Sequence, residues 1–329
     1  MNAEFALVTG ATGFIGRWLV KLLALRGINV RAGIHNTSHA ETIHPTDGVE
    51  PIDIDILDRQ SLGDAMESID AVYHFAALVD TKAPKDDLFR VNVEGTRNVW
   101  HCAAERGVKA ALYCSSTAVY GLLAKDHQPV SEKIRPKAIE PYGRSKLLGE
   151  TVASEIADKW GLHTVIIRPV AVFGPGEHSP FGNQLRQAVF SKLLLAAGFQ
   201  NRRFSFVHVE DVAEAAMHLI SAPGSDGQAY NIAVDRPILF EEAFQSYLRA
   251  LKQSRRPLTR VKLLAQLSKW VHELPGLSHR LSRYDGHRSA FNIWQPGFDM
   301  TYSSRKLLST SFRFKWNRFE DVLLSCINE

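Results

Sequence analysis

A tyrosine and a lysine lie four residues apart in this sequence, a spacing at which their side chains could act together in a reaction. They are Tyr142 and Lys146, in the segment YGRSK, which opens a predicted helix. Side chains at positions i and i+4 share one face of a helix, so the ammonium would lie beside the phenol. A neighbouring positive charge favours the phenolate and lowers the pKa of the phenol. The pair therefore predicts a general acid or base that works near neutral pH.

A segment rich in hydroxyl groups supplies a third candidate side chain. Residues 113–121 read YCSSTAVYG and end a predicted strand, where the hydroxyl of Ser116 or Thr117 could hydrogen-bond a substrate oxygen. Tyrosine–lysine spacings and SST segments also occur without function, in ordinary helices and strand ends. Their joint occurrence, in this order and downstream of a glycine turn, favours the functional interpretation.

The glycine turn lies in residues 7–17, LVTGATGFIGR, between a predicted strand and a predicted helix. We expect Gly10 to permit a tight turn, Gly13 to let the backbone approach a pyrophosphate, and Gly16 to let the helix pack closely on the strand. The helix N-terminus would offer free N–H groups and a partial positive charge to the anion. The spacing is G-x-x-G-x-x-G, and no P-loop pattern is present. The segment predicts a dinucleotide site.

The second predicted strand bears on which dinucleotide is bound. An NAD site usually has an acidic residue at the end of this strand, which holds the ribose 2′-hydroxyl. Here the strand ends in Ile34 and His35, and no carboxylate follows until Glu41. We therefore expect NADP as the cofactor, with His35 near its 2′-phosphate. NAD is the alternative cofactor. A solvated loop position for His35 remains the alternative.

Short apolar runs alternate with helical periodicity through the first half of the chain. The strands are expected at residues 5–9, 28–34, 51–54, 71–75, 110–114 and 164–167. The helices are expected at residues 14–25, 61–66, 86–105 and 146–160. Such repetition predicts an α/β fold, a Rossmann-type doubly wound parallel sheet with a smaller, mostly helical substrate domain.

The pattern loosens after about residue 170, which suggests how the domains divide. A strand-like segment at 205–209 and a helix at 211–220 indicate that the chain returns to the sheet. We expect residues 1–169 and about 205–236 to form the dinucleotide-binding domain. Residues from about 170 to 204 and from 237 to 329 would form the substrate-binding region.

Composition excludes several classes of protein. The 329 residues carry a net charge of +4, too weak a bias to indicate nucleic-acid binding. Cys102, Cys114 and Cys326 form no C-x-x-C pair, and the histidines lack metal-ligand spacing, so neither disulfides nor a metal are expected. The first nine residues lack a positive n-region, and no apolar run reaches 18 residues. A cytoplasmic protein without an integral membrane segment is the expectation.

Taken together, the motifs resemble the extended short-chain dehydrogenase/reductase superfamily, which includes the NAD-dependent epimerases and dehydratases. The resemblance covers about residues 3 to 220. It rests on TGATGFIG, DILD (55–58), YHFAA (73–77), NVEGTRNV (92–99), SSTAVYG, YGRSK, RPVAVFGPG (168–176) and FVHVEDVA (206–213). The tail, residues 296–314, is similar to that of the 3β-hydroxysteroid dehydrogenase and carbonyl-reductase branch.

The resemblance implies a role for each matching residue. Tyr142 would be the acid/base, Lys146 would hold the nicotinamide ribose, and Ser116 would be the catalytic hydroxyl, with Thr117 as the alternative if the loop is shifted by one. Asn92 would be structural, and Arg17 would lie near a 2′-phosphate or on the surface. The cofactor would contact Gly10, Thr12, Gly13, Phe14, Ile15, Gly16, His35, Asp55, Ile56, Ala76, Ala77, Tyr142, Lys146, Pro169 and Val172. The substrate would contact Val79, Thr117, Phe173 and Phe181.

Several features bear on the reaction. Dehydratases of the family often carry an Asp-Glu pair where this chain has Thr117 and Ala118, so dehydration is disfavoured. Arg202 and Arg203 partly match the arginines of sugar-nucleotide enzymes. The apolar segment at 181–199 suits a bulky, weakly polar substrate, although core packing would explain it equally well.

The expected function is therefore an NAD(P)-dependent oxidoreductase that interconverts a secondary alcohol and a ketone. One alternative is an NDP-sugar 4-epimerase with tightly bound NAD. Another is a non-catalytic NAD(P)-sensing protein, although such proteins typically lose the tyrosine or the lysine.

Two further expectations concern partners. The resemblance implies a homodimer in which residues 86–105 and 146–160 of two copies form a four-helix bundle. The basic run from Arg249 to Lys269 would be a peripheral membrane contact, a diphosphate-binding rim or a solvated helix face.

Overall fold

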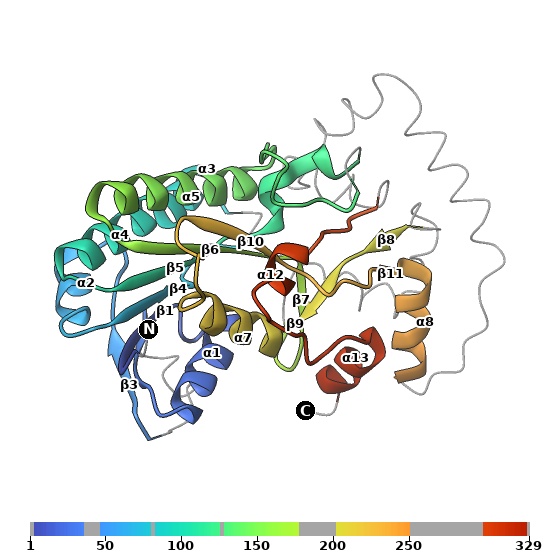
Figure 1. The fold of residues 1–329 in the computed structure, drawn as a ribbon, viewed down its shortest axis with the longest axis horizontal. Helices are drawn as coiled ribbons and strands as arrows, with labels where there is room; N and C mark the ends of the chain where they lie inside the picture. The colour runs from blue at the N-terminus through green and yellow to red at the C-terminus, as the bar shows by residue number, and fades with distance from the viewer. Residues whose placement is uncertain are drawn as a thin grey trace.

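A seven-stranded parallel sheet forms the centre of the computed structural model, which describes residues 3–35, 47–79, 83–125, 128–177, 202–250 and 299–327 (Figure 1). The strand order is β10-β6-β5-β4-β1-β2-β3, so the chain moves outward from β1 in one direction and from β4 in the other. The strands are β1 (Phe5–Thr9), β2 (Asn29–Ile34), β3 (Val49–Asp53), β4 (Ala71–His74), β5 (Ala110–Cys114), β6 (His163–Pro169) and β10 (Gln228–Ile232).

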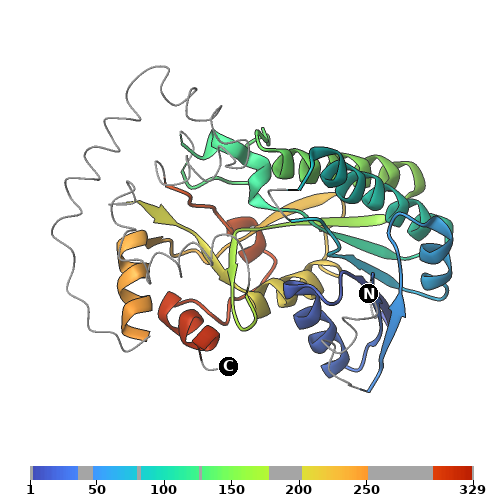
Figure 2. The same ribbon diagram turned by 180° about the vertical axis from the view of Figure 1, so that it is seen from behind.

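Helices cover both faces of this sheet, as Figures 1 and 2 show. One face carries α1 (Phe14–Leu25) and α7 (Val209–Leu219), which pack against each other. The other face carries α2 (Arg59–Ala65), α3 (Lys85–Phe89), α4 (Gly95–Glu105) and α5 (Pro141–Trp160). This arrangement confirms the doubly wound α/β fold that the alternating pattern predicted.

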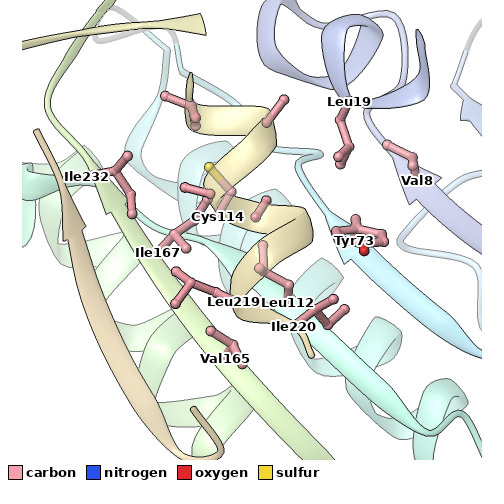
Figure 3. Packing of buried hydrophobic residues seen from close by; sticks show 14 of the residues in the cluster. Val8, Leu19, Tyr73, Leu112, Cys114, Val165, Ile167, Leu219, Ile220 and Ile232 are labelled. Carbon is pink, nitrogen blue, oxygen red and sulfur yellow. The ribbon is translucent and has the colours of Figure 1, made fainter. Parts of the chain in front are cut away.

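The inner strands are apolar because they are covered on both sides. Every residue of β4 and β5 is buried, as a parallel sheet between two helical layers requires. In the cluster under α1 and α7, side chains from β1, β2, β4, β5, β6 and β10 meet those of the two helices, and Figure 3 shows part of this packing. Leu112 and Leu219 belong to this cluster, whereas Trp100 and Tyr113 belong to the cluster under α4 and α5.

Helix α5 positions the predicted catalytic pair. Pro141 occupies the first helical positions, where its missing N–H costs nothing, and Gly161 ends the helix with a φ of +67°. The helix therefore begins just before Tyr142, which lies in its first turn. Lys146 follows about one turn later on the same face of the helix.

Two predicted elements differ in the structure. The single helix expected at 86–105 is divided into α3, a π-helical turn at Arg90–Glu94 and α4. The strand expected at 205–209 does not return to the sheet, because β9 (Phe206–His208) pairs with β7 (Ala171–Phe173) in a separate parallel pair. The chain rejoins the sheet through β10, whose mixed polar sequence QAYNI gave no strong strand signal.

The remaining described elements lie beyond β6, on one side of the sheet (Figure 1). They are a nine-residue 3-10 segment at Thr117–Lys125, β8 (Arg203–Phe204), β11 (Ile238–Leu239), α8 (Phe240–Ala250), α12 (Arg305–Leu308) and α13 (Phe319–Ile327). A third apolar cluster joins Phe204 and Phe206 to Phe240 and Phe319. The division into two domains stays a prediction. The basic residues from 252 to 269 lie outside the described residues, so their roles stay predictions as well.

The close packing of α1 on the glycine turn is testable by substitution. A Cβ atom at Gly16 would lie 2.1 Å from the carbonyl oxygen of Gly10, which is backbone and cannot swing away. We expect Gly16→Ala to lower the free energy of unfolding by about 2–3 kcal/mol, measured by urea denaturation. In the control Gly63→Ala, the new methyl would meet only the flexible end of Arg106, so stability should hold or rise. Equal stability of the wild type and Gly16→Ala would contradict the packing argument.

Candidate active site

A cavity of about 1140 Å³ lies along the carboxyl ends of the central strands. Its walls come from the segments that follow β1, β3, β4 and β5, from the end of β6 and from the start of α5. The cavity straddles the point between β1 and β4 where the chain direction across the sheet reverses. In open α/β sheets ligands bind at this point, because the loops from neighbouring strands diverge there.

The glycine turn forms one wall of the cavity through close backbone contacts. Gly10 has a φ of +70°, and a Cβ atom there would lie 2.6 Å from the backbone nitrogen of Ala76. No side chain caps the N-terminus of α1, so N–H groups of its first turn are left to a ligand. A cradle without side chains, facing a helix N-terminus, fits the pyrophosphate of a dinucleotide.

The three predicted catalytic residues line this same cavity. The phenol of Tyr142 is hydrogen-bonded to Ser116, whose Oγ also accepts from the backbone N–H of Ala118 at 3.1 Å. The hydroxyl of Thr117 is turned elsewhere, since it donates to the carbonyl oxygen of Pro169 at 3.2 Å and is hydrogen-bonded to Tyr302. The geometry therefore favours Ser116, and not Thr117, as the hydroxyl that acts with Tyr142.

The electrostatics of the pair differ from the expectation in one respect. Burial raises the pKa of Tyr142 above its ordinary value, and the hydrogen bond from Ser116 opposes this only in part. Lys146 is not among the groups that lower the pKa of the phenol. Burial also lowers the pKa of Lys146 to about 8, against the opposing effects of Cys114 and Glu150. The expected lowering of the pKa of the phenol is therefore wrong for this arrangement, because desolvation outweighs the hydrogen bond from Ser116.

The Lys146 ammonium lies 4.4 Å from the centroid of the Tyr113 ring, in cation–π geometry. The lysine side chain is 3% exposed, so the ring and the cavity surround it almost completely. This contact helps to keep a charged group in a buried position beside the phenol.

Asn92 supports the wall from behind, as expected of a structural residue. Its amide donates to the carbonyl oxygen of Leu78 at 3.0 Å and to Oγ of Ser145 at 2.9 Å, and its Oδ1 accepts from the N–H of Leu78. Ser145 in turn donates to the carbonyl oxygen of Tyr142. Asn92 sits in the π-helical turn, a feature that often marks functional sites.

The predicted cofactor residues gather on the cavity. Its lining includes Gly10, Thr12, Gly13, Phe14, Ile15, Gly16, His35, Asp55, Ile56, Ala76, Ala77, Tyr142, Lys146, Pro169 and Val172. His35 is exposed at the end of β2, which leaves its ring accessible to a ligand. Arg17 is not among the lining residues, because its guanidinium donates to the carbonyl oxygen of Gly176 at 3.0 Å.

The predicted substrate residues divide into three groups. Val79 and Thr117 line the cavity. Phe173 does not: it is 3% exposed and packs edge-on against Phe319, with ring centroids 5.3 Å apart. Ala171 and Val172 line the cavity, whereas the next residue, Phe173, enters the apolar cluster that contains Phe319. Phe181 lies outside the described residues.

Sequence reasoning missed a wall that comes from distant parts of the chain. Phe204, Ser205, Met300 and Tyr302 all line the cavity. Ser205 ties the two segments together, since its N–H donates to the carbonyl oxygen of Met300 and its Oγ accepts from the N–H of Tyr302. The tail motif was noticed, but nothing in its spacing places it beside Ser116.

Comparisons with known proteins identify the family of the chain. The model of the NAD dependent epimerase/dehydratase family matches residues 6–233. The chain is 34% identical to the uncharacterized protein y4nG of Sinorhizobium fredii, over 69% of this chain and 55% of that protein. It is 30% identical to 3beta-hydroxysteroid-dehydrogenase/decarboxylase isoform 2 of Arabidopsis thaliana, over 97% of this chain and 58% of that protein. The chain thus spans little more than half the length of these relatives.

One solved structure supports the fold along the whole chain. The crystal structure of gox2253 superposes with a TM-score of 0.79, at 25% identity, and covers 99% of this chain and 97% of that one. The similarity therefore includes the part of the chain beyond the family match.

The two neighbouring hydroxyls make the site testable. We expect Ser116→Ala to lower kcat by about a hundredfold, because the hydrogen bond to Tyr142 is lost at the reacting group. Thr117→Ala should lower kcat by less than about tenfold, because its hydroxyl is bonded to Pro169 and Tyr302. Steady-state kinetics on both variants decide the assignment. The reverse order of effects would make Thr117 the catalytic hydroxyl.

Proposed function

Because this chain belongs to the NAD dependent epimerase/dehydratase family, we propose that it is an NAD(P)-dependent oxidoreductase that interconverts a secondary alcohol and a ketone. The observation that carries the proposal is that Ser116, Tyr142 and Lys146 share a cavity with the glycine turn. In the proposed reaction, Tyr142 would be a proton donor, Ser116 a hydroxyl and Lys146 a cation beside a dinucleotide cradle.

Each group has a defined task in this reaction. The glycine turn and the N-terminus of α1 would hold the pyrophosphate, and the bound cofactor supplies hydride chemistry at its nicotinamide. Tyr142 holds the proton that moves to or from the substrate oxygen, and its raised pKa keeps the phenol protonated for reduction of a ketone. Ser116 hydrogen-bonds the same oxygen and orients it. Lys146 would hold the nicotinamide ribose and supply positive charge near the phenol.

The charges around the cavity support a weakly polar substrate. Within the described ranges, the lysines and arginines that line the cavity are Arg90 and Lys146. Arg202 and Arg203, the candidates for holding a diphosphate, are exposed and lie outside the lining. Val79, Phe204 and Met300 give the described wall an apolar character. A nucleotide diphosphate would need more cationic groups than this wall offers, whereas a steroid-like alcohol or ketone suits it.

The position of His35 supports NADP as the preferred cofactor. His35 is exposed at the end of β2 and lines the cavity, where an NAD site would usually have a carboxylate. An imidazole can hydrogen-bond a 2′-phosphate, and it does not repel one.

A homodimer formed through α4 and α5 stays a prediction, and so does a cytoplasmic location. The two helices pack side by side on one face of the sheet. Among the described helices, none is long and apolar enough to span a bilayer.

The acid/base role is tested by Tyr142→Phe. We expect kcat to fall by about a thousandfold in ketone reduction, because the proton donor is removed, while the Kd for NADPH stays within threefold. Kinetics and fluorescence titration measure the two quantities. Full turnover by Tyr142→Phe with every substrate found would sink the proposed mechanism.

Cofactor preference is tested by His35→Asp. A carboxylate there would repel the 2′-phosphate, so the Kd for NADPH should rise about tenfold and the Kd for NADH should not. His35→Asn is the uncharged control and should change both affinities little. If His35→Asp left the preference for NADPH over NADH unchanged, the residue at the end of β2 would not determine which cofactor is bound.

The sugar-nucleotide alternative is tested by the cofactor that the protein retains. Protein purified without added nucleotide should be empty and should bind NADPH on titration. Release of about one NAD per chain on denaturation, together with epimerisation of a UDP-sugar, would contradict the proposal and support the epimerase.

A further inference from the structure

A buried ion pair lies directly behind the catalytic wall. The carboxylate of Glu150 accepts from Nε of Arg168 at 2.9 Å and, through its other oxygen, from Nη2 at 2.6 Å. It also accepts from Oγ of Ser115 at 2.5 Å. Glu150 is 5% exposed, Arg168 6% and Ser115 4%, so all three groups are shielded from water.

The pair is the centre of a longer network. Nη1 of Arg168 donates to the hydroxyl of Tyr120 at 2.8 Å, and this hydroxyl donates to Oδ1 of Asn231 at 2.9 Å. The backbone carbonyl of Asn231 accepts from Ser304, in the C-terminal segment that also contributes Met300 and Tyr302 to the cavity. The network therefore joins α5, β6 and β10 to the far wall of the cavity.

Stability alone does not explain such a pair. Removing two charges from water costs several kcal/mol per ion, and apolar residues of similar volume often replace a buried ion pair without loss of stability. The position of the pair suggests another use, because both of its neighbours on the cavity side belong to the catalytic machinery.

The first neighbour is the loop that carries Ser116. Ser115 directly precedes it and is held on two sides, since its N–H donates to the carbonyl oxygen of Ile167 at 2.8 Å and its Oγ donates to Glu150. With both groups fixed, the loop has little freedom to move Ser116 away from Tyr142.

The second neighbour is Lys146. Glu150 follows it by four residues on α5, and Tyr142 precedes it by four, so the three side chains occupy one face of the helix. We propose that Glu150, held by Arg168, is a positioning residue that fixes Ser116 through Ser115 and sets a negative charge on the helix face that carries Lys146. The inference rests on the proposed function and adds a residue that does not itself touch the reacting atoms.

The charges around Lys146 give the direction of the effect. The groups that face it are His74 from β4, Tyr113 and Cys114 from β5, and Tyr142 and Glu150 from its own helix. Burial lowers the pKa of Lys146 to about 8, and the carboxylate of Glu150 opposes this fall. Without the carboxylate, the pKa of Lys146 should fall further, so less of the lysine would be charged at pH 7–8.

The proposal has an electrostatic half, the effect of Glu150 on Lys146, and a positioning half, the fixing of Ser116 through Ser115. The electrostatic half is tested by NMR titration of Lys146 in protein labelled with ¹³C at lysine Cε. Lys146→Arg assigns the signal. Glu150→Gln alone leaves the Arg168 guanidinium buried and unpaired, so the double variant Glu150→Gln, Arg168→Gln is the safer test. We expect the pKa of Lys146 to fall in the double variant, by less than about one unit, because losing the Arg168 cation offsets part of the loss of the carboxylate. A titration identical to that of the wild type would overturn this half of the proposal.

The positioning half is tested by Ser115→Ala, which removes one hydroxyl and leaves the ion pair intact. We expect kcat to fall about tenfold while KM and the Kd for NADPH stay within twofold, because the loop is loosened but the pockets are kept. Ser225→Ala is the matched control, since Ser225 is fully buried, its hydroxyl is hydrogen-bonded to Ala222 and His163, and it is not among the cavity-lining residues. An equal effect of the two variants on kcat would reduce Ser115 to a structural role.

The two halves also separate this inference from the proposed function. If no alcohol or ketone is turned over but the Lys146 titration still shifts, the proposed function fails and the electrostatic coupling stands. If Tyr142→Phe abolishes reduction but neither Ser115→Ala nor the double variant has its expected effect, the function stands and the positioning role fails.

Discussion

The close approach of three backbone segments at the centre of the sheet is the constraint on which the site depends. The turn after β1, the first turn of α1 and the segment after β4 meet where a Cβ on Gly10 or Gly16 would overlap backbone atoms. The cavity lies beyond the carboxyl ends of β1 and β4, where the chain direction across the sheet reverses. The helix N-terminus then faces that space, and the ends of β5 and β6 place the catalytic residues on its other side.

Burial sets the chemistry of the catalytic wall. Low solvent exposure raises the pKa of the Tyr142 phenol and lowers the pKa of the Lys146 ammonium, so each group is displaced toward its neutral form. The protein offsets this tendency with the Tyr113 ring over the ammonium and with the Glu150 carboxylate one turn further along the helix. The same burial strengthens the hydrogen bond that fixes Ser115 to Glu150, since water does not compete for it.

Most of the site could be predicted because its parts are local. Strand–turn–helix order predicted the glycine cradle, and helical spacing placed Tyr142 beside Lys146. Features that depend on distant contacts could not be predicted in this way. The cavity wall formed by Met300 and Tyr302 depends on pairing with residues 203–205, and the burial of Phe173 depends on packing against Phe319. The raised pKa of Tyr142 depends on desolvation, which spacing does not reveal.

The most direct measurement is the transfer of deuterium from NADPH labelled at nicotinamide C4 to the product, followed by mass spectrometry over a panel of ketones and UDP-sugars. The label is tested on both faces of C4, in separate reactions. The account predicts that at least one ketone is reduced to an alcohol that gains one deuterium, from only one of the two labelled forms of NADPH. With Tyr142→Phe, it predicts no gain of deuterium. Epimerised UDP-sugar without deuterium, formed by protein that already holds NAD, would contradict it.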